Sequence, residues 1–537
     1  MSTLTVPLTG TGSLTRLALR RDRVMLPIWA VVVGGMVASG VGSIQALYDT
    51  PAARAEVAGA MSGNSSLRAL YGPVFGDSVG GLVAWRFGVF SATLAAVMSL
   101  IIVVRHTREE EETGRQEMLS ATVVGRRAPL TAALLTAVFA NALVALIITA
   151  GLAGQGAGGA LALGLAVGGT GMLFATMAAI VAQLTESARL AKGLTAGVLG
   201  TAFLLRAAGD SGKSGGTSQD GVLGGGSSVL TWLSPIGWAE NVRPYGGERW
   251  WVLLLIGAAV LVQAGVAYGL TNRRDVGMSF LPTRPGPAVG RLATAAALAW
   301  RLQRGGLLGW SIGFLVAGIA FGGMASGAAD IVGDNEQARE IFERMGGQSA
   351  LESAFLAAMI GMFGMIAALY AVGSVLRLHG EETSGRAEPI LANAVGRIRW
   401  AAGHLVIAFA GAVLIMVLSG VGLSLTYGKD LGPILGACLV QLPAVWTLAG
   451  VAVLFHGAFP KAAVAGWAAA GICLVIGWIG PALNLPRAVL NLSPFGHLPK
   501  LPGQEMTWTP VLALTALAVA LVAAGLAGLR RRDLMSS

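Results

Sequence analysis

The segment EEETGRQEMLSATVVGR, from Glu110 to Arg126, returns 271 positions later as EETSGRAEPILANAVGR, from Glu381 to Arg397. The two copies align without a gap, and most of the shared residues are glutamate, glycine or arginine. The matched pairs are Glu110/Glu381, Glu111/Glu382, Gly114/Gly385, Arg115/Arg386, Glu117/Glu388, Ala121/Ala392, Val124/Val395, Gly125/Gly396 and Arg126/Arg397. A match of this length in one register indicates an internal duplication.

Shorter matching segments on either side extend the duplication along the chain. They are LALRRDRVMLPIW (Leu17–Trp29) with LAWRLQRGGLLGW (Leu298–Trp310), LSPIG (Leu233–Gly237) with LSPFG (Leu492–Gly496), and the Arg-Arg-Asp of Arg273–Asp275 with that of Arg531–Asp533. We therefore divide the chain into a first half, residues 1–275, a cytoplasmic linker, residues 276–300, and a second half, residues 301–537.

The composition excludes a soluble protein. Of the 537 residues, 54% are hydrophobic and 12% are charged, whereas soluble domains carry about 25% charged residues. Long charge-free apolar segments, each about long enough to cross a bilayer as a helix, recur along the chain. They are Met25–Leu47, Phe87–Val104, Ala128–Gly154, Gly158–Thr185, Trp250–Leu270, Gly305–Ala329, Ser353–Leu376, Trp400–Gly428, Leu431–Leu454, Ala462–Leu485 and Thr507–Leu529. None shows the alternation of a barrel strand, so the sequence predicts an all-α polytopic membrane protein.

A further span is expected at Leu194–Leu205, although it has only 12 residues, with Arg206 snorkelling at one end. With it the chain has about twelve transmembrane helices in two parallel six-helix repeats, related by an axis along the membrane normal. Placing both termini in the cytoplasm puts 25 of the 37 basic residues on the inner side. The net charge of +10 therefore reflects orientation in the cell membrane, and no nucleic-acid partner is expected.

The repeated segment lies on the cytoplasmic side, between the second and third spans of each half. Met118, Leu119, Thr122 and Val123 recur at helical spacing, as do Ile390, Leu391 and Ala394 in the second copy. This spacing predicts a short amphipathic helix along the membrane face. A solvated positive-inside loop is the alternative. Because glutamate and glycine recur along with arginine, we favour a docking element that a cytoplasmic partner grips once per half.

The pattern E-E-x-x-G-R-x-E-x-L resembles the motif that follows the second span in ABC-2 exporter-type permeases. Six spans per half and an amphipathic N-terminal segment, Leu14–Arg23, are also similar to that family's half-transporter. The fusion of two halves in one Gly/Ala-rich chain resembles the actinobacterial permeases called polyketide-antibiotic or multidrug exporters. One departure is Pro389, which stands where the first copy has Met118 and allows a helix to begin only near that point.

The resemblance implies that each half docks one copy of a soluble ABC ATP-binding subunit, which holds ATP and Mg²⁺. It also implies a substrate path between the halves, lined by spans 1, 2 and 5 and by spans 7, 8 and 11. The residues that would couple the chain to the ATPase are Glu110, Glu111, Gly114, Arg115, Glu117, Glu381, Glu382, Gly385, Arg386 and Glu388.

No catalytic site or cofactor is expected in the chain itself. A nucleotide-binding P-loop needs G-x-x-x-x-G-K-[ST] after a strand, and the nearest stretch, Ala207–Ser214, lacks the first glycine. The five histidines are dispersed, with no pair at metal-ligand spacing, and Cys438 and Cys473 lie in apolar runs. We therefore expect no metal site, and a separate polypeptide as the ATPase.

The spans are nearly free of ionisable residues, which favours a hydrophobic or amphipathic cargo such as a drug, an antibiotic or a lipid-like metabolite. Their polar residues, Gln45, Asn141, Gln263 and Gln441, are expected to bond between helices. No substrate-binding residue can be assigned. Two other functions stay open: a proton-coupled secondary transporter with parallel six-helix repeats, and a membrane scaffold that senses rather than transports. On the outer side, Asp334–Met345 and Pro51–Met61 are expected to form surface helices.

Overall fold

A computed structural model describes residues 7–63, 65–211, 228–275, 277–281, 294–325, 351–428, 431–479 and 486–533. Helices are the only regular secondary structure in these ranges, which confirms the all-α fold class. The chain divides into two compact units, Met1–Pro285 and Gly286–Ser537, and the division falls inside the stretch expected to be a linker. The predicted outer helix at Asp334–Met345 lies outside the described residues.

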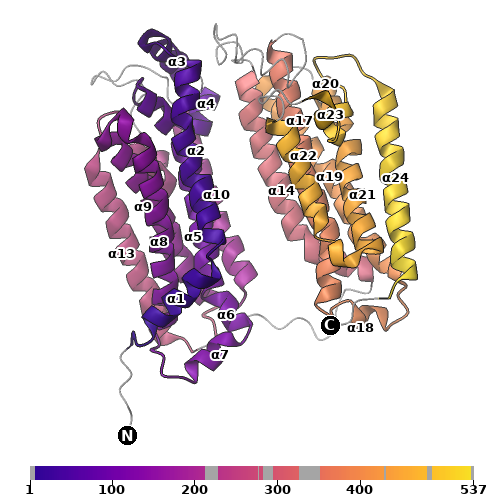
Figure 1. Cartoon of the computed structure of the whole chain (residues 1–537), viewed down its shortest axis with the longest axis horizontal. Helices are drawn as coiled ribbons and strands as arrows, with labels where there is room; N and C mark the ends of the chain where they lie inside the picture. Colours follow the sequence, from indigo (N-terminus) through magenta and orange to yellow (C-terminus); the bar gives the residue numbers. More distant parts are fainter. Residues whose placement is uncertain are drawn as a thin grey trace. The chain divides into compact units, whose positions relative to one another are not determined.

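Eleven helices in the described ranges are long and apolar enough to cross a membrane. Those of the first unit are α2 (Met25–Leu47), α5 (Val79–Arg105), α8 (Ala128–Leu152), α9 (Ala157–Leu184), α10 (Ala188–Ser211) and α13 (Trp250–Arg273). Those of the second unit are α14 (Ala295–Ala325), α17 (Leu351–Thr383), α19 (Arg397–Tyr427), the broken span of α20 (Leu431–Val440) and α21 (Leu442–Ala458), and α24 (Trp508–Arg531). The shorter α22 (Ala465–Ile479) stands where the span Ala462–Leu485 is expected (Figure 1).

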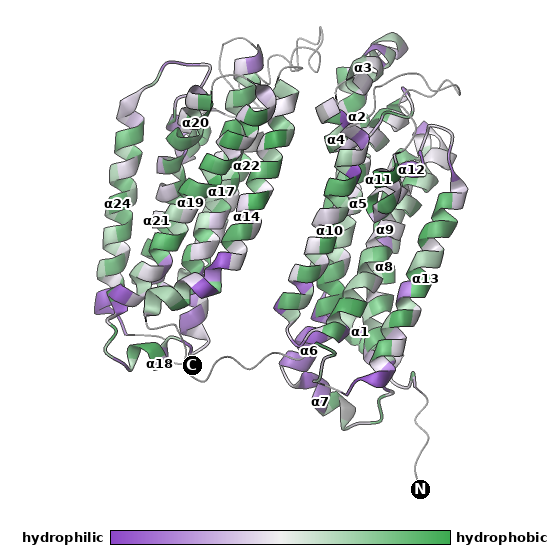
Figure 2. Ribbon diagram, turned by 180° about the vertical axis from the view of Figure 1, so that it is seen from behind, coloured by the Kyte–Doolittle hydropathy of each residue, from purple (hydrophilic) through white to green (hydrophobic). Residues whose placement is uncertain are grey.

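Shorter helices join and flank these spans. They are α1 (Thr11–Arg21), α3 (Pro51–Gly63), α4 (Ser65–Tyr71), α6 (Arg108–Glu112), α7 (Arg115–Ser120), α11 (Val229–Leu233), α12 (Pro235–Asn241), α18 (Glu388–Leu391) and α23 (Arg487–Leu490), with 3₁₀ turns at Ala153–Gln155, Pro460–Ala462 and Pro494–His497. Figure 2 shows that the spans are mostly hydrophobic and that hydrophilic residues gather around α6 and α7.

The expected short fifth span is a full-length helix, and the predicted role of Arg206 is wrong. Helix α10 has 24 residues, but Arg189, Lys192 and Arg206 interrupt its apolar run, so hydropathy alone detects only its middle. Arg206 does not snorkel, because its side chain is 0% exposed. Its Nη2 donates to the carbonyl oxygens of Ala69, at 2.6 Å, and Leu70, at 3.0 Å, which satisfy the guanidinium inside the protein.

Polar residues join helices inside the first unit, as predicted for two of the four mid-span residues. Asn141 Nδ2 donates to Ser99 Oγ at 2.8 Å, which links α8 to α5. Gln263 Oε1 accepts from Thr176 Oγ1 at 2.7 Å, which links α13 to α9. Such bonds between helices fix their rotation and register within a bilayer.

The second unit brings helix backbones together through glycine. A Cβ on Gly422 of α19 would lie 2.5 Å from the carbonyl oxygen of Leu315 on α14. A Cβ on Gly457 of α21 would lie 1.8 Å from the carbonyl oxygen of Gly525 on α24. Without a hydrophobic force between helices in lipid, this close packing contributes much of the energy of association.

Candidate functional site

The repeated segment folds into a tight turn in each unit, built around a glycine. Gly114 has φ 71° and stands between α6 and α7, while Gly385 has φ 69° and stands between α17 and α18. A Cβ at either position would meet nothing within 4 Å, so the positive φ, and not lack of space, is what requires glycine. The recurrence of this glycine in the two copies therefore has a local conformational cause.

The predicted amphipathic helix is wrong in its extent, because this turn and the early end of the following helix limit its length. Helix α7 ends at Ser120 and α18 ends at Leu391, so Val123 and Ala394 lie beyond the helical turns. Met118 and Val123 are 67% and 69% exposed. Pro389 stands in the first turn of α18, where a proline is compatible with a helix.

The first glutamate of each copy closes the turn. Arg115 Nε donates to Glu110 Oε2 at 2.8 Å, and Arg386 Nε donates to Glu381 Oε2 at 3.0 Å. In the first unit Glu110 also pairs with Arg21, at the end of α1. These four predicted coupling residues therefore act within the chain, where they hold the shape of the turn.

The second glutamate of each copy binds an arginine that follows the last helix of its half. Glu111 accepts two hydrogen bonds from Arg274, at 2.9 and 2.5 Å, and Glu382 accepts two from Arg532, both at 2.6 Å. The Glu111 and Glu382 side chains are 12% and 1% exposed. The sequence showed that the Arg-Arg-Asp ends recur, but it gave no sign of this contact.

The last glutamate of each copy is the one that a partner could reach. Glu117 in α7 and Glu388 in α18 are exposed, and neither carboxylate has a hydrogen bond or ion pair with the described residues. The structure thus separates the ten predicted coupling residues into three kinds. Glu110, Gly114, Arg115, Glu381, Gly385 and Arg386 shape the turn, Glu111 and Glu382 are engaged in ion pairs, and Glu117 and Glu388 are exposed.

A buried histidine of α21 lies beside the Glu382 pair. His456 on α21 is 1% exposed, and its Nε2 lies 3.7 Å from Glu382 Oε2. His404 instead shares a hydrogen bond of 2.8 Å with Gln303. Within the described ranges, no group of three or more histidine, cysteine, aspartate or glutamate side chains could hold a metal ion.

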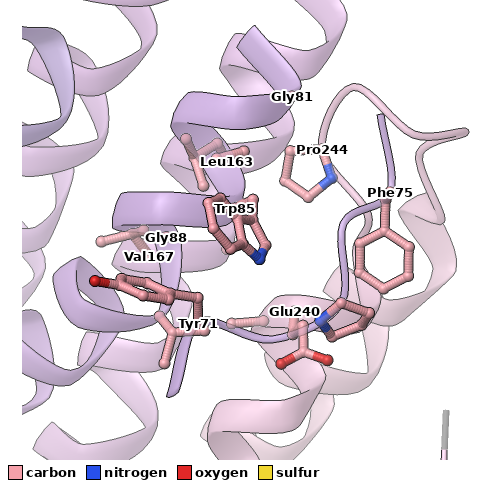
Figure 3. Close-up of a pocket in the computed structure, with 14 residues that line it drawn as sticks. Tyr71, Phe75, Gly81, Trp85, Gly88, Leu163, Val167, Glu240 and Pro244 are labelled. Carbon is pink, nitrogen blue, oxygen red and sulfur yellow. The ribbon is translucent and has the colours of Figure 1, made fainter. Parts of the chain in front are cut away.

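A small cavity at the other end of the first unit has aromatic walls and one acid (Figure 3). It has a volume of about 40 Å³ and is lined by Tyr71, Phe75, Trp85 and Glu240, among others. The Tyr71 and Trp85 rings have their centroids 5.0 Å apart. This volume has room for a few water molecules and is far below the several hundred Å³ of a typical drug site.

Beside this cavity lies a buried charge cluster that the sequence did not reveal. Glu240 Oε2 and Asp210 Oδ2 lie 3.4 and 3.3 Å from Arg206 Nη1, and Arg68 Nε donates to the carbonyl oxygen of Asp210. Burial and the neighbouring Asp210 carboxylate raise the pKa of Glu240 well above its ordinary value, while Arg206 opposes the shift. The cluster ties α4, α10 and α12 together at this end of the unit.

Comparison with known proteins places the chain in a family. It is 42% identical to the multidrug efflux system permease protein Rv1217c of Mycobacterium tuberculosis (strain ATCC 25618 / H37Rv), and the alignment covers 98% of this chain and 95% of that protein. Residues 292–530 also match the family model of the C-terminal domain of that permease. Together with the spanning helices, this similarity identifies a transmembrane permease of an efflux system, with a role in transport and not in catalysis. The chain belongs to the family of multidrug efflux system permeases.

Proposed function

We propose that the chain forms the whole transmembrane part of an ABC exporter and docks two copies of a separate ATP-binding subunit, one on each repeated segment. The partner subunits hold ATP and Mg²⁺, and their hydrolysis cycle drives cargo out of the cell. The observation that carries the proposal is the pair of exposed, unengaged carboxylates, Glu117 and Glu388, at equivalent places beside two short helices. A basic groove on each ATP-binding subunit is the complementary surface.

The position of the chain ends supports a cytoplasmic location for both segments. Gly125 N donates to the carbonyl oxygen of Thr9 at 2.9 Å, so the residues that precede α1 pack on the first repeated segment. Arg532, close to the other end, binds Glu382 in the second. The first and last described residues therefore lie on the same side of the membrane as the repeated segment of their own unit, and the excess of basic residues favours the cytoplasmic side of the cell membrane.

The cargo is proposed to be a hydrophobic or amphipathic compound. An open groove of about 480 Å³ runs along α14 and α17, and its walls include Trp310, Phe314 and Phe363. The volume is in the range of small-molecule sites, and no charged residue lines the groove. These two helices are the seventh and eighth spans, which supports the expected lining of the substrate path.

Affinity purification in mild detergent, followed by identification of bound subunits, tests the proposal. Wild-type permease should retain an ABC ATPase, and Glu117→Arg with Glu388→Arg should lose it. Glu56→Arg is the matched control, because Glu56 is equally exposed but lies on α3, at the end of the unit away from α7. Retention of the ATPase by the double variant would reject these docking sites. Transport that proceeds without any ATPase and stops with an uncoupler would reject the exporter itself.

A further inference from the structure

An arginine just past the last helix of the first unit is held from two sides by the repeated segment. Glu111 binds the Arg274 guanidinium with both carboxylate oxygens, at 2.9 and 2.5 Å. Arg126, at the other end of the same segment, donates from Nη2 to the Arg274 carbonyl oxygen at 2.7 Å. Arg274, directly after α13, is thus held through both its side chain and its backbone.

The second unit repeats this arrangement with the equivalent residues. Glu382 binds the Arg532 guanidinium through two bonds of 2.6 Å, and Arg397 Nη1 donates to the Arg532 carbonyl oxygen. Glu111 and Glu382 are a matched pair of the duplication, and so are Arg126 and Arg397. We call each three-residue set, Glu111–Arg126–Arg274 and Glu382–Arg397–Arg532, a clamp.

The flanking groups differ, while the clamp itself does not. Glu111 also pairs with Arg108, whereas the residue equivalent to Arg108 is His379, and Glu382 has His456 at 3.7 Å instead. The glutamate–arginine pair is present in both units although its neighbours differ. We therefore infer that the pair itself is needed.

The helices that the clamps hold lie at the edges of their units, each packed mainly on one neighbour. In the most apolar stretch of α13, and likewise in that of α24, only 17% of the residues are buried, against 61% for α5. Helix α13 packs mainly on α9, and α24 mainly on α21. A bidentate arginine–carboxylate pair is directional and strong when shielded from water, so each clamp sets where the cytoplasmic end of a peripheral helix lies.

We propose that each clamp makes the last helix of its half move together with the docking segment, so that a displacement imposed by the ATP-binding subunit reaches α13 and α24 directly. This inference rests on the proposed function. Arg274 and Arg532 are then positioning residues, which contact neither the partner nor the cargo. The exposed Glu117 and Glu388 bind the partner, and the clamps transmit its displacement to α13 and α24.

The test uses full-length permease and its ATP-binding subunit in proteoliposomes, with a fluorescent hydrophobic dye as cargo. In Arg274→Gln with Arg532→Gln, we expect the bound subunit and its basal ATPase rate to stay near wild type. Dye transported per ATP hydrolysed should fall by about tenfold, in line with measured coupling energies between sites. The matched control is Arg273→Gln with Arg531→Gln, which removes the same charge from the neighbouring, exposed arginines and should leave this ratio unchanged.

Charge exchange distinguishes transmission from loss of folding. Glu382→Arg with Arg532→Glu rebuilds the second pair in reverse and should recover much of the transport lost in either single variant. In Glu382→Cys with Arg532→Cys, a short bifunctional thiol reagent that bridges the two positions should leave transport intact, since the two sites move as one.

Several results would overturn the clamp proposal. These are an unchanged transport ratio in the double glutamine variant, loss of the subunit in that variant alone, or a block of transport by the bridge. Failure of the wild-type chain to hold any ATPase would instead reject the proposed function.

Discussion

Glu240 Oε2 lies 3.4 Å from Arg206 Nη1, so a carboxylate of the short helix α12 is paired with an arginine that is fully buried in the span α10. Asp210 shares the same guanidinium at 3.3 Å. Removing one member of a buried ion pair leaves the remaining charge without compensation. The end of the first unit that carries the small aromatic cavity therefore depends on one arginine.

Replacing that arginine should destabilise the first unit. Arg206→Gln leaves Asp210 and Glu240 close together without their cation, and losses of about 3–5 kcal/mol in the free energy of unfolding are usual for such changes. Thermal unfolding of the purified permease in detergent measures the effect as a lower midpoint. Arg189→Gln, on the exposed start of the same helix, is the control and should unfold like wild type. Equal midpoints for the two variants would show that the cluster contributes nothing.

Stability should also depend on pH through Glu240. Its pKa is raised in the native state by burial and by Asp210, whereas an unfolded glutamate titrates near about 4.3. The native protein therefore keeps this proton to higher pH than the unfolded chain, so the stabilisation is complete below about pH 4.3 and is lost as pH rises through the native pKa. The other charged groups that face Glu240 are Arg206 and Asp210, and Arg68 acts on Asp210 from the far side of the cluster.

Comparison with a neutral isostere isolates this contribution. Between pH 5 and 8, approximately, the melting midpoint of wild type should fall relative to that of Glu240→Gln, in which no proton is lost at this site. The comparison cancels the titration of carboxylates remote from this cluster, and the difference between the curves reports Glu240 together with the Asp210 to which it is coupled. Two curves that run parallel over this range would show that Glu240 is ionised in the native state.

Hydropathy and the repeat predicted the helical fold well where apolar residues run without interruption, as in Met25–Leu47, whose predicted bounds are those of α2. Prediction was poor where charge enters a span. Arg189 and Lys192 conceal the first turns of α10 from a hydropathy pattern, and the expected position of Arg206 at the membrane surface is wrong. The carbonyl groups that bind Arg206, those of Ala69 and Leu70, are distant from it in the sequence. A pattern of neighbouring residues cannot predict such a contact.

The repeat identified the docking segment as a unit but could not separate its residues by role. Glu111 and Glu117 are both glutamates and both recur, yet Glu111 is paired with Arg274 and Glu117 is exposed. That difference depends on a partner 163 positions away from Glu111. Recurrence shows which residues are kept between copies, and only the three-dimensional contacts show which of them remain available to another protein.

The turn glycines give a prediction specific to the docking segments. Gly114→Ala with Gly385→Ala should strain both turns, at about 1–2 kcal/mol each for an L-residue with positive φ, and should weaken binding of the ATP-binding subunit. Asparagine tolerates this conformation better, so Gly114→Asn with Gly385→Asn should bind more tightly than the alanine variant. Subunit binding to immobilised permease measures the order. Alanine variants that bind as well as wild type would mean that the turn has no need of the positive φ.

The close contact between α21 and α24 provides the last prediction. A methyl group at Gly457 would lie 1.8 Å from the carbonyl oxygen of Gly525, and because that neighbour is backbone, the whole helix must shift to accommodate it. Overpacking of this kind costs about 1–3 kcal/mol or more, so Gly457→Ala should lower the melting midpoint of the permease. It should also reduce export, because Arg532 directly follows α24 and a displacement of α24 would disturb the pair between Arg532 and Glu382. Gly471→Ala on α22, where a Cβ meets nothing within 4 Å, should change neither property. A Gly457→Ala variant with wild-type stability would show that α24 does not rest on α21 at this point.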